Sequence, residues 1–129
     1  MKVISFEPLN KALSSLERAM AQPINEFTRD SVIQRFEYTF ELSWKLLLKI
    51  LEADRPLDDG SVKGILRESG KLGYINSVET WFEFQRARNL TSHTYNEEVA
   101  EEVFKVAAAF SKECRQMLAL VKKHILKDK

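Results

Sequence analysis

Apolar residues recur every three or four positions through most of the chain, and this spacing predicts amphipathic helices. The first helix ends at Pro23, and its apolar stripe consists of Phe6, Leu9, Leu13, Leu16 and Met20. A second helix is expected from about Asp30 to Ala53, where Pro56 and Asp58-Asp59-Gly60 mark a turn.

The second helix carries more apolar residues than one stripe needs. The stripe itself consists of Ile33, Phe36, Phe40, Trp44, Leu47 and Leu51. Further apolar residues lie on its other sides, and these are Val32, Leu42, Leu46, Leu48 and Ile50. Such a helix is expected either at the centre of the protein or with one side against another chain.

Three more helices follow. The third is expected from Ser61 to about Leu72, closed by Gly70 and Gly73, and the fourth begins after a cap at Asn76 or Ser77. The last starts near Asn96, and its bundle-type stripe consists of Val99, Val103, Val106, Phe110, Met117 and Val121. Because no convincing strand pattern interrupts them, the sequence predicts an all-α fold, an antiparallel bundle of about five helices.

Composition narrows the class of protein. The chain has 129 residues, which favours a single domain over residues 1–129, and 44% hydrophobic with 30% charged residues is typical of a folded soluble protein. The formal net charge is only +1, so the overall electrostatic field indicates binding neither to nucleic acid nor to a membrane surface. The single Cys114 and the absence of a signal-peptide pattern favour a cytoplasmic protein without a membrane partner.

The most chemically informative segment is Arg88-Asn89-Leu90-Thr91-Ser92-His93-Thr94-Tyr95. It combines a permanent cation, an imidazole that can titrate near neutral pH and a phenol. On an unbroken helix Arg88 and His93 would point about 140° apart, so a break between the fourth and last helices is expected. Thr94-x-x-Glu97 offers a capping box for the last helix just after that break.

This segment resembles the signature of the HEPN superfamily, an arginine, four residues, a histidine, one residue and a tyrosine. The chain is most similar to the HepT-like proteins, also called nucleotidyltransferase substrate-binding proteins. Further resemblance lies in Lys63-Gly64-Ile65-Leu66-Arg67-Glu68, Lys71-Leu72-Gly73, Trp81 and the stretch from Phe36 to Trp44.

The resemblance implies an all-helical homodimer in which the motifs of two subunits face one composite cleft. It implies a toxin of a toxin–antitoxin pair, a metal-independent ribonuclease without a cofactor, which a minimal nucleotidyltransferase encoded nearby silences by adenylylation. By that resemblance Arg88 and His93 are catalytic, Asn89 and Ser92 orient the cleft, and Tyr95 is the modified residue. The older family name implies an alternative, a non-catalytic subunit that presents a substrate or nucleotide to the transferase.

These residue types suit metal-independent RNA cleavage through the 2′-hydroxyl. Histidine can accept or donate a proton at cellular pH, and arginine can set two N–H groups against phosphoryl oxygens. Each motif residue also has a structural alternative. His93 could cap or pack between helices, Arg88 could pair with Glu97 or Glu98, and Tyr95 could pack at the corner.

The remaining charged and aromatic residues each have a structural interpretation beside a functional one. Lys63, Arg67 and Lys71 form a basic ridge that could contact RNA or phosphate, although such ridges are usually solvated. The last helix begins with several acids that we interpret as complements of the helix dipole and not as metal ligands, namely Glu97, Glu98, Glu101 and Glu102. The tryptophans and phenylalanines are expected in the core or a subunit interface.

Three other kinds of site are excluded by the sequence pattern. Gly64 to Gly70-Lys71 has the wrong spacing for a phosphate-binding loop and lies in a predicted helix. One cysteine and two distant histidines provide no zinc framework. Asp58-Asp59-Gly60-Ser61 lacks the order and the sheet that a nucleotidyltransferase needs, so the chain is expected to be the partner of such an enzyme.

Overall fold

The computed structural model describes the backbone of residues 4–127 and the side chains as far as Ile125. Over this range the chain forms five α-helices and one 3-10 turn, with no strand, which confirms the predicted all-α bundle. No helix in the described part is both long and apolar enough to cross a membrane.

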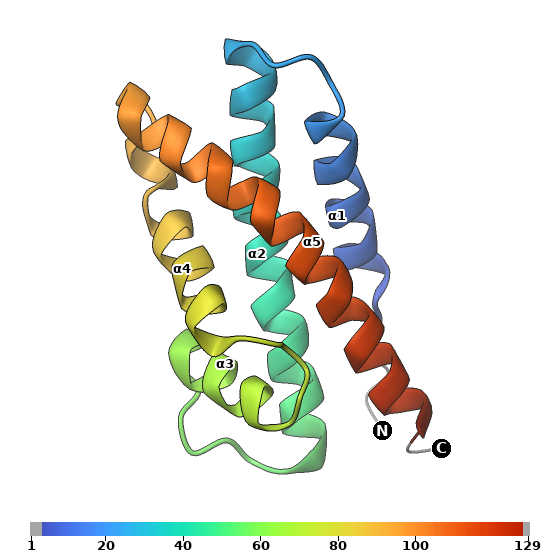
Figure 1. Ribbon diagram of the computed structural model, residues 1–129. Coiled ribbons are helices and arrows are strands. Elements are labelled where there is room, and N and C mark those ends of the chain that lie inside the picture. The colour runs from blue at the N-terminus through green and yellow to red at the C-terminus, as the bar shows by residue number, and fades with distance from the viewer. Residues whose placement is uncertain (1–3, 128–129) are drawn as a thin grey trace.

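The helices follow one another as an up-and-down bundle with a crossing last helix (Figure 1). In chain order they are α1 (Glu7–Met20), α2 (Glu26–Asp54), α3 (Val62–Lys71), α4 (Val78–Asn89), the 3-10 turn η1 (Thr91–His93) and α5 (Glu97–Lys127). α1 and α2 form an antiparallel pair, α3 lies beside the far end of α2, and α4 returns along α2. α5 then crosses the face formed by α1, α2 and α4.

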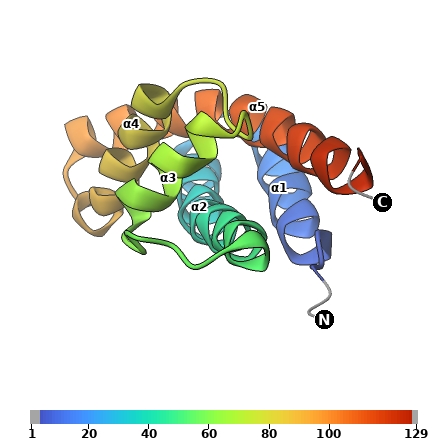
Figure 2. The same cartoon turned by 90° about the horizontal axis from the view of Figure 1, so that it is seen from below.

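α2 is the central helix, and it contacts every other helix of the bundle (Figures 1 and 2). Its extra apolar residues Val32, Leu46 and Ile50 are buried together with the predicted stripe except Trp44, so the protomer's own core accounts for them. Trp44 and Leu48 are only partly buried. The predicted central position is therefore confirmed, and one side of α2 remains partly exposed.

An aromatic cluster fixes α4 and α5 against α2. Phe110 of α5 lies at its centre, with ring centroids 5.2 to 6.1 Å from those of Phe36, Phe40, Trp81 and Phe84. Several of these pairs meet edge to face, a favourable arrangement for aromatic rings. Phe27 is 80% exposed in the protomer, so it lies outside the core, and for it the expected subunit interface stays a prediction.

The start of α2 differs from the sequence prediction, and the start of α4 decides between two caps that the prediction left open. α2 begins at Glu26, before the expected Asp30, because the Asn25 side chain accepts hydrogen bonds from the Phe27 and Thr28 amides. The Thr28 hydroxyl in turn accepts the Asn25 amide hydrogen at 2.8 Å and completes a capping box. At α4 the structure selects Ser77 as the cap, since its hydroxyl accepts from the Thr80 amide.

Candidate functional site

The motif lies at the corner between α4 and α5, as expected from the predicted break. α4 ends at Asn89, and the His93 amide donates to the Leu90 carbonyl at 2.9 Å within η1. The Asn96 amide then donates to the His93 carbonyl at 3.1 Å, immediately before α5 begins. The chain therefore changes direction over a few residues, and Arg88 and His93 no longer share one helical axis.

The cap of α5 is Asn96 and not the predicted capping box at Thr94. The Asn96 Oδ1 accepts from the Glu98 amide at 2.9 Å and from the Val99 amide at 3.2 Å. The Thr94 hydroxyl instead donates to the Thr91 carbonyl at 3.2 Å, within the turn. The prediction of Thr94 was wrong because the turn uses that hydroxyl for its own backbone.

His93 and Tyr95 lie together on the surface. The Tyr95 hydroxyl is 3.5 Å from Nδ1 of His93, and the two rings meet edge to face with centroids 6.0 Å apart. Both residues are exposed, and Tyr95 keeps 84% of its surface accessible. The alternative that Tyr95 packs at the corner is therefore wrong, and phenol and imidazole are both open to a reactant.

Arg88 points toward α2. Its Nε donates to Oε1 of Glu41 at 2.9 Å, and its Nη2 lies 3.8 Å from Oε1 of Glu37. The side chain of Arg88 is 30% exposed. Arg88 thus forms ion pairs, as the structural alternative expected, but Glu97 and Glu98 were the wrong partners. The acids that hold the guanidinium come from α2. Sequence reasoning missed both of them.

The two residues proposed to orient the cleft lie on either side of the start of η1. Asn89 is the last residue of α4, Ser92 is within η1, and both are exposed. Between them the Thr91 hydroxyl donates to the Arg88 carbonyl at 2.8 Å, which ties the turn to the end of α4. Asn89 and Ser92 are therefore accessible beside the motif, while Thr91 acts on the backbone.

The acidic start of α5 joins that helix to its neighbours. Glu97 and Glu101 both bind Nη1 of Arg29 on α2, at 2.7 and 3.2 Å, and Glu102 pairs with Arg86 on α4. The hydrogen bond from Arg29 holds the pKa of the Glu97 carboxyl below its usual range. These acids therefore do more than complement the helix dipole, since three of them form ion pairs between helices.

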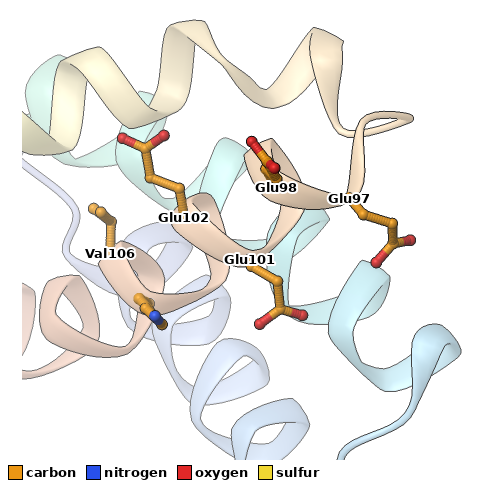
Figure 3. A pocket seen from close by; sticks show the side chains of 6 residues that line it. Glu97, Glu98, Glu101, Glu102 and Val106 are labelled. Atoms are coloured by element: carbon orange, nitrogen blue, oxygen red, sulfur yellow. The ribbon is translucent and has the colours of Figure 1, made fainter.

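A shallow hollow of about 500 Å³ lies over this acidic row (Figure 3). Its lining residues are Glu97, Glu98, Glu101, Glu102, Lys105 and Val106. In the close-up Glu97 and Glu101 extend toward α2, and Glu102 extends to the other side of α5. No group of histidine, cysteine, aspartate or glutamate residues in the described part of the chain is arranged to hold a metal ion.

The basic ridge lies on α3, away from the motif corner. Lys63 and Arg67 lie over the Phe82 ring of α4, 5.4 and 5.5 Å from its centroid. Arg67 also approaches Asp59 at 3.9 Å, as Lys71 approaches Glu68. Since α3 lies beside the start of α4 and the motif follows its end, one protomer does not bring the ridge to the motif (Figure 1).

Comparison with known proteins gives one family and a named relative. The family model described as "nucleotidyltransferase substrate binding protein like" matches residues 4–123. The probable ribonuclease HepT of Haemophilus influenzae is 38% identical over 76 residues, which are 56% of this chain and 52% of that protein. The chain therefore spans about half the length of this curated relative.

Two solved structures share the fold. A crystal structure of a Thermus thermophilus protein superposes with a TM-score of 0.79 at 33% identity, over 86% of this chain and 96% of that one. A Haemophilus influenzae protein, described as revealing the fold of a substrate binding domain of a nucleotidyltransferase, gives 0.84 at 30% identity, over 92% and 99%. By the family match over residues 4–123, the chain belongs to the nucleotidyltransferase substrate-binding, HepT-like family.

Proposed function

We propose that the protein is a HepT-like ribonuclease toxin, and that a partner nucleotidyltransferase encoded nearby silences it by adenylylating Tyr95. One observation carries the proposal. The Tyr95 hydroxyl lies 3.5 Å from Nδ1 of His93, with both rings at the surface. A group attached to that hydroxyl would occupy the space in front of the imidazole. The name of the relative, probable ribonuclease HepT, supports the same activity.

The proposed reaction uses the substrate's own 2′-hydroxyl as nucleophile. His93 accepts the 2′-hydroxyl proton, the 2′-oxygen attacks phosphorus, and Arg88 stabilises the added negative charge on the phosphoryl oxygens. The bond to the 5′-oxygen breaks, and that oxygen takes a proton from an imidazolium. The products are a 2′,3′-cyclic phosphate and a 5′-hydroxyl, which require neither an external oxidant nor a co-reactant.

A homodimer would supply two imidazoles to one cleft, one as base and one as acid. A partly exposed stripe on α2 supports this part of the proposal. Glu37, Glu41, Trp44 and Leu48 are spaced by four, three and four residues, so they lie on one side of the helix, the side that meets Arg88. A second protomer covering the apolar half of this stripe would lie next to the guanidinium.

Adenylylation would inhibit by charge and by size. The adenylyl phosphodiester adds a negative charge at the corner that carries Arg88 and His93, where the phosphate of RNA is proposed to bind. The adenosine part adds bulk in front of the His93 ring. Both effects act on the same step, so modified protein is expected to lose RNA affinity as well as turnover. Both partners are proposed to act in the cytoplasm, where RNA is available.

Cleavage of RNA by the purified protein in EDTA tests the nuclease. His93→Ala is expected to lower the rate by about 10²- to 10⁴-fold through loss of general acid–base catalysis. His124→Ala, at the opposite end of α5, is the matched control and should keep the wild-type rate. Cleavage that survives His93→Ala in a folded protein would rule out this catalytic role.

Intact mass after co-expression with the neighbouring transferase tests the modification. Wild-type protein is expected to gain the mass of one adenylyl group per site, and Tyr95→Phe should gain none. Tyr38→Phe is the matched control, since Tyr38 is also an exposed tyrosine but lies on α2. If the added mass persists in Tyr95→Phe, the modified residue is another one.

The alternative function is a binding subunit that presents a substrate or nucleotide to the transferase. The family description favours it, as does the substrate binding domain described for the Haemophilus influenzae structure. In that case RNA remains intact under all conditions, while a stable complex with the transferase forms and His93→Ala leaves it unchanged. The EDTA assay and a pull-down with the transferase therefore separate the two functions.

A further inference from the structure

The guanidinium of Arg88 is held by a carboxylate that is itself held on both oxygens. Oε1 of Glu41 accepts from Nε of Arg88 at 2.9 Å, and Oε2 accepts from Nε1 of Trp44 at 3.2 Å. All three side chains are partly buried. Because its partners approach from two directions, Glu41 has little freedom to turn, and the arginine that it binds is ordered with it.

The nitrogen that Glu41 uses is informative. A guanidinium has five N–H groups in one plane, and Glu41 takes the single N–H on Nε. Within the described part of the chain neither Nη1 nor Nη2 donates a hydrogen bond, and Nη2 lies 3.8 Å from Oε1 of Glu37, beyond hydrogen-bonding distance. The two Nη groups are thus left to bind a pair of phosphoryl oxygens.

Glu37 has a different relation to Arg88 although it lies one turn from Glu41 on the same stripe. Its carboxylate is next to Nη2, where an incoming phosphate would bind, so it competes with the phosphate and repels it. Glu41 is therefore expected to favour phosphate binding by Arg88 and Glu37 to oppose it. Substitution of either acid is a control for substitution of the other.

We propose that Glu41 is the positioning residue for Arg88, and that Trp44 fixes Glu41 in turn. This inference rests on the proposed ribonuclease function, because it assigns the direction in which Arg88 presents its Nη groups to the scissile phosphate. Glu41 does not touch the substrate in this arrangement. Because Glu41 acts only through the guanidinium, its substitution should have no further effect once Arg88 has been removed.

The test is a double-mutant cycle on Glu41 and Arg88, with two readouts. One is the single-turnover cleavage rate, and the other is the affinity for an uncleavable 2′-O-methyl oligoribonucleotide. Glu41→Ala is expected to lower the rate about 10- to 100-fold, the usual cost of a misplaced catalytic group. In an Arg88→Ala background the same substitution should change the rate less than twofold, because nothing remains to position.

Two conservative variants separate positioning from folding. Glu41→Gln keeps an oxygen that can accept from Nε and should recover most of the lost rate. Trp44→Phe keeps a ring but removes the N–H, and its smaller loss should also vanish in the Arg88→Ala background. Glu37→Gln is the control from the same helix side, and it should bind the oligonucleotide more tightly than wild type.

The outcomes distinguish this inference from the function on which it rests. Wild-type protein that neither cleaves nor binds RNA defeats both. If wild type cleaves and Glu41→Ala in folded form cleaves equally well, only the positioning role is wrong. The same holds if Glu41→Ala lowers the rate as much without Arg88 as with it, since Glu41 would then act independently of the guanidinium.

Discussion

Gly64 lies where the loop after α2 passes over α3. A Cβ atom at this position would lie 2.4 Å from the Asp59 carbonyl oxygen, a contact that only a backbone shift could relieve. We expect Gly64→Ala to lower the free energy of unfolding by about 1–3 kcal/mol, the usual cost of overpacking. Urea denaturation followed by circular dichroism measures this change.

Gly60→Ala is the matched control for that substitution. A Cβ at Gly60 has no neighbour within 4 Å, so its stability should stay within about 0.5 kcal/mol of wild type, as at most surface sites. If both variants lost the same free energy of unfolding, the short distance between position 64 and the Asp59 carbonyl would not be the cause of the loss.

Cys114 predicts an alkaline loss of stability. Burial raises the pKa of its thiol to about 12 against an ordinary value of 9.0, an effect that the hydrogen bond with Ser43 partly opposes. The unfolded chain therefore releases this proton at lower pH than the folded one. Stability from this group is complete below pH 9 and declines between pH 9 and 12, by at most about 1.4 kcal/mol per pH unit.

Thermal unfolding of wild type and Cys114→Ala across this pH range isolates the thiol from the lysines and tyrosines that titrate beside it. The wild-type curve should decline more steeply with rising pH. Parallel curves would mean that the thiol keeps the same pKa in the folded and unfolded states.

Single-residue chemistry was only partly predictable from the sequence. His93 and Tyr95 stand out because the chain has only 2 histidines and 3 tyrosines, and Arg88 because it precedes them closely. His93 and Tyr95 do meet in the structure. Glu41 could not be recognised as the partner of Arg88, because 47 positions separate them and the chain contains 19 acidic residues. Only the packing of α4 against α2 selects the right one.

At the scale of elements, two asparagine caps allow a matched comparison. Asn25 caps α2 and Asn96 caps α5, each through two backbone amides. Replacing either by alanine should cost about 1 kcal/mol, or roughly 4 °C in Tm. Only Asn96→Ala should also reduce RNA cleavage, because Asn96 fixes the helix start three residues after His93.

Differential scanning fluorimetry and the EDTA cleavage assay, run side by side, check the caps. If Asn25→Ala reduces cleavage as much as Asn96→Ala does, the loss reflects general destabilisation and not a local change at the corner.

Helix number and order followed from periodicity, while the ends depended on side-chain hydrogen bonds that periodicity does not report. The start of α2 was placed too late because its capping box uses Thr28 in place of the more familiar glutamate or glutamine. The start of α5 was found, but Thr94 was a false cap because η1 already uses its hydroxyl. A local side-chain hydrogen bond decided each case, as the cap itself at α2 and as a competitor of the cap at Thr94.

At the scale of the whole molecule, the partly exposed side of α2 predicts an assembly. Leu48→Lys would put a charge into the proposed protomer contact, where its desolvation is costly, and should yield monomers. Lys49→Glu, on the neighbouring exposed position, is the control and should remain dimeric. Sedimentation velocity at micromolar concentration measures both, and RNA cleavage should fall together with the dimer.

A folded Leu48→Lys variant that still sediments as a dimer would place the contact elsewhere on the molecule. The sequence pattern alone could not show which side of α2 stays exposed in the folded protein. The excess of apolar residues on α2 indicated a central helix or a subunit contact, and only the folded structure divides these residues into buried ones such as Leu46 and partly exposed ones such as Leu48.

The number of residues in the turn Thr91–His93 sets how His93 and Tyr95 are oriented relative to α4. One residue inserted into η1 would rotate everything after it by about 120° relative to α4, if the added residue continued the 3-10 path. Tyr95 would turn with His93, so their mutual contact would survive while the position of both relative to Arg88 changed. Natural variants of this corner should therefore tolerate changes of residue type more readily than insertions or deletions.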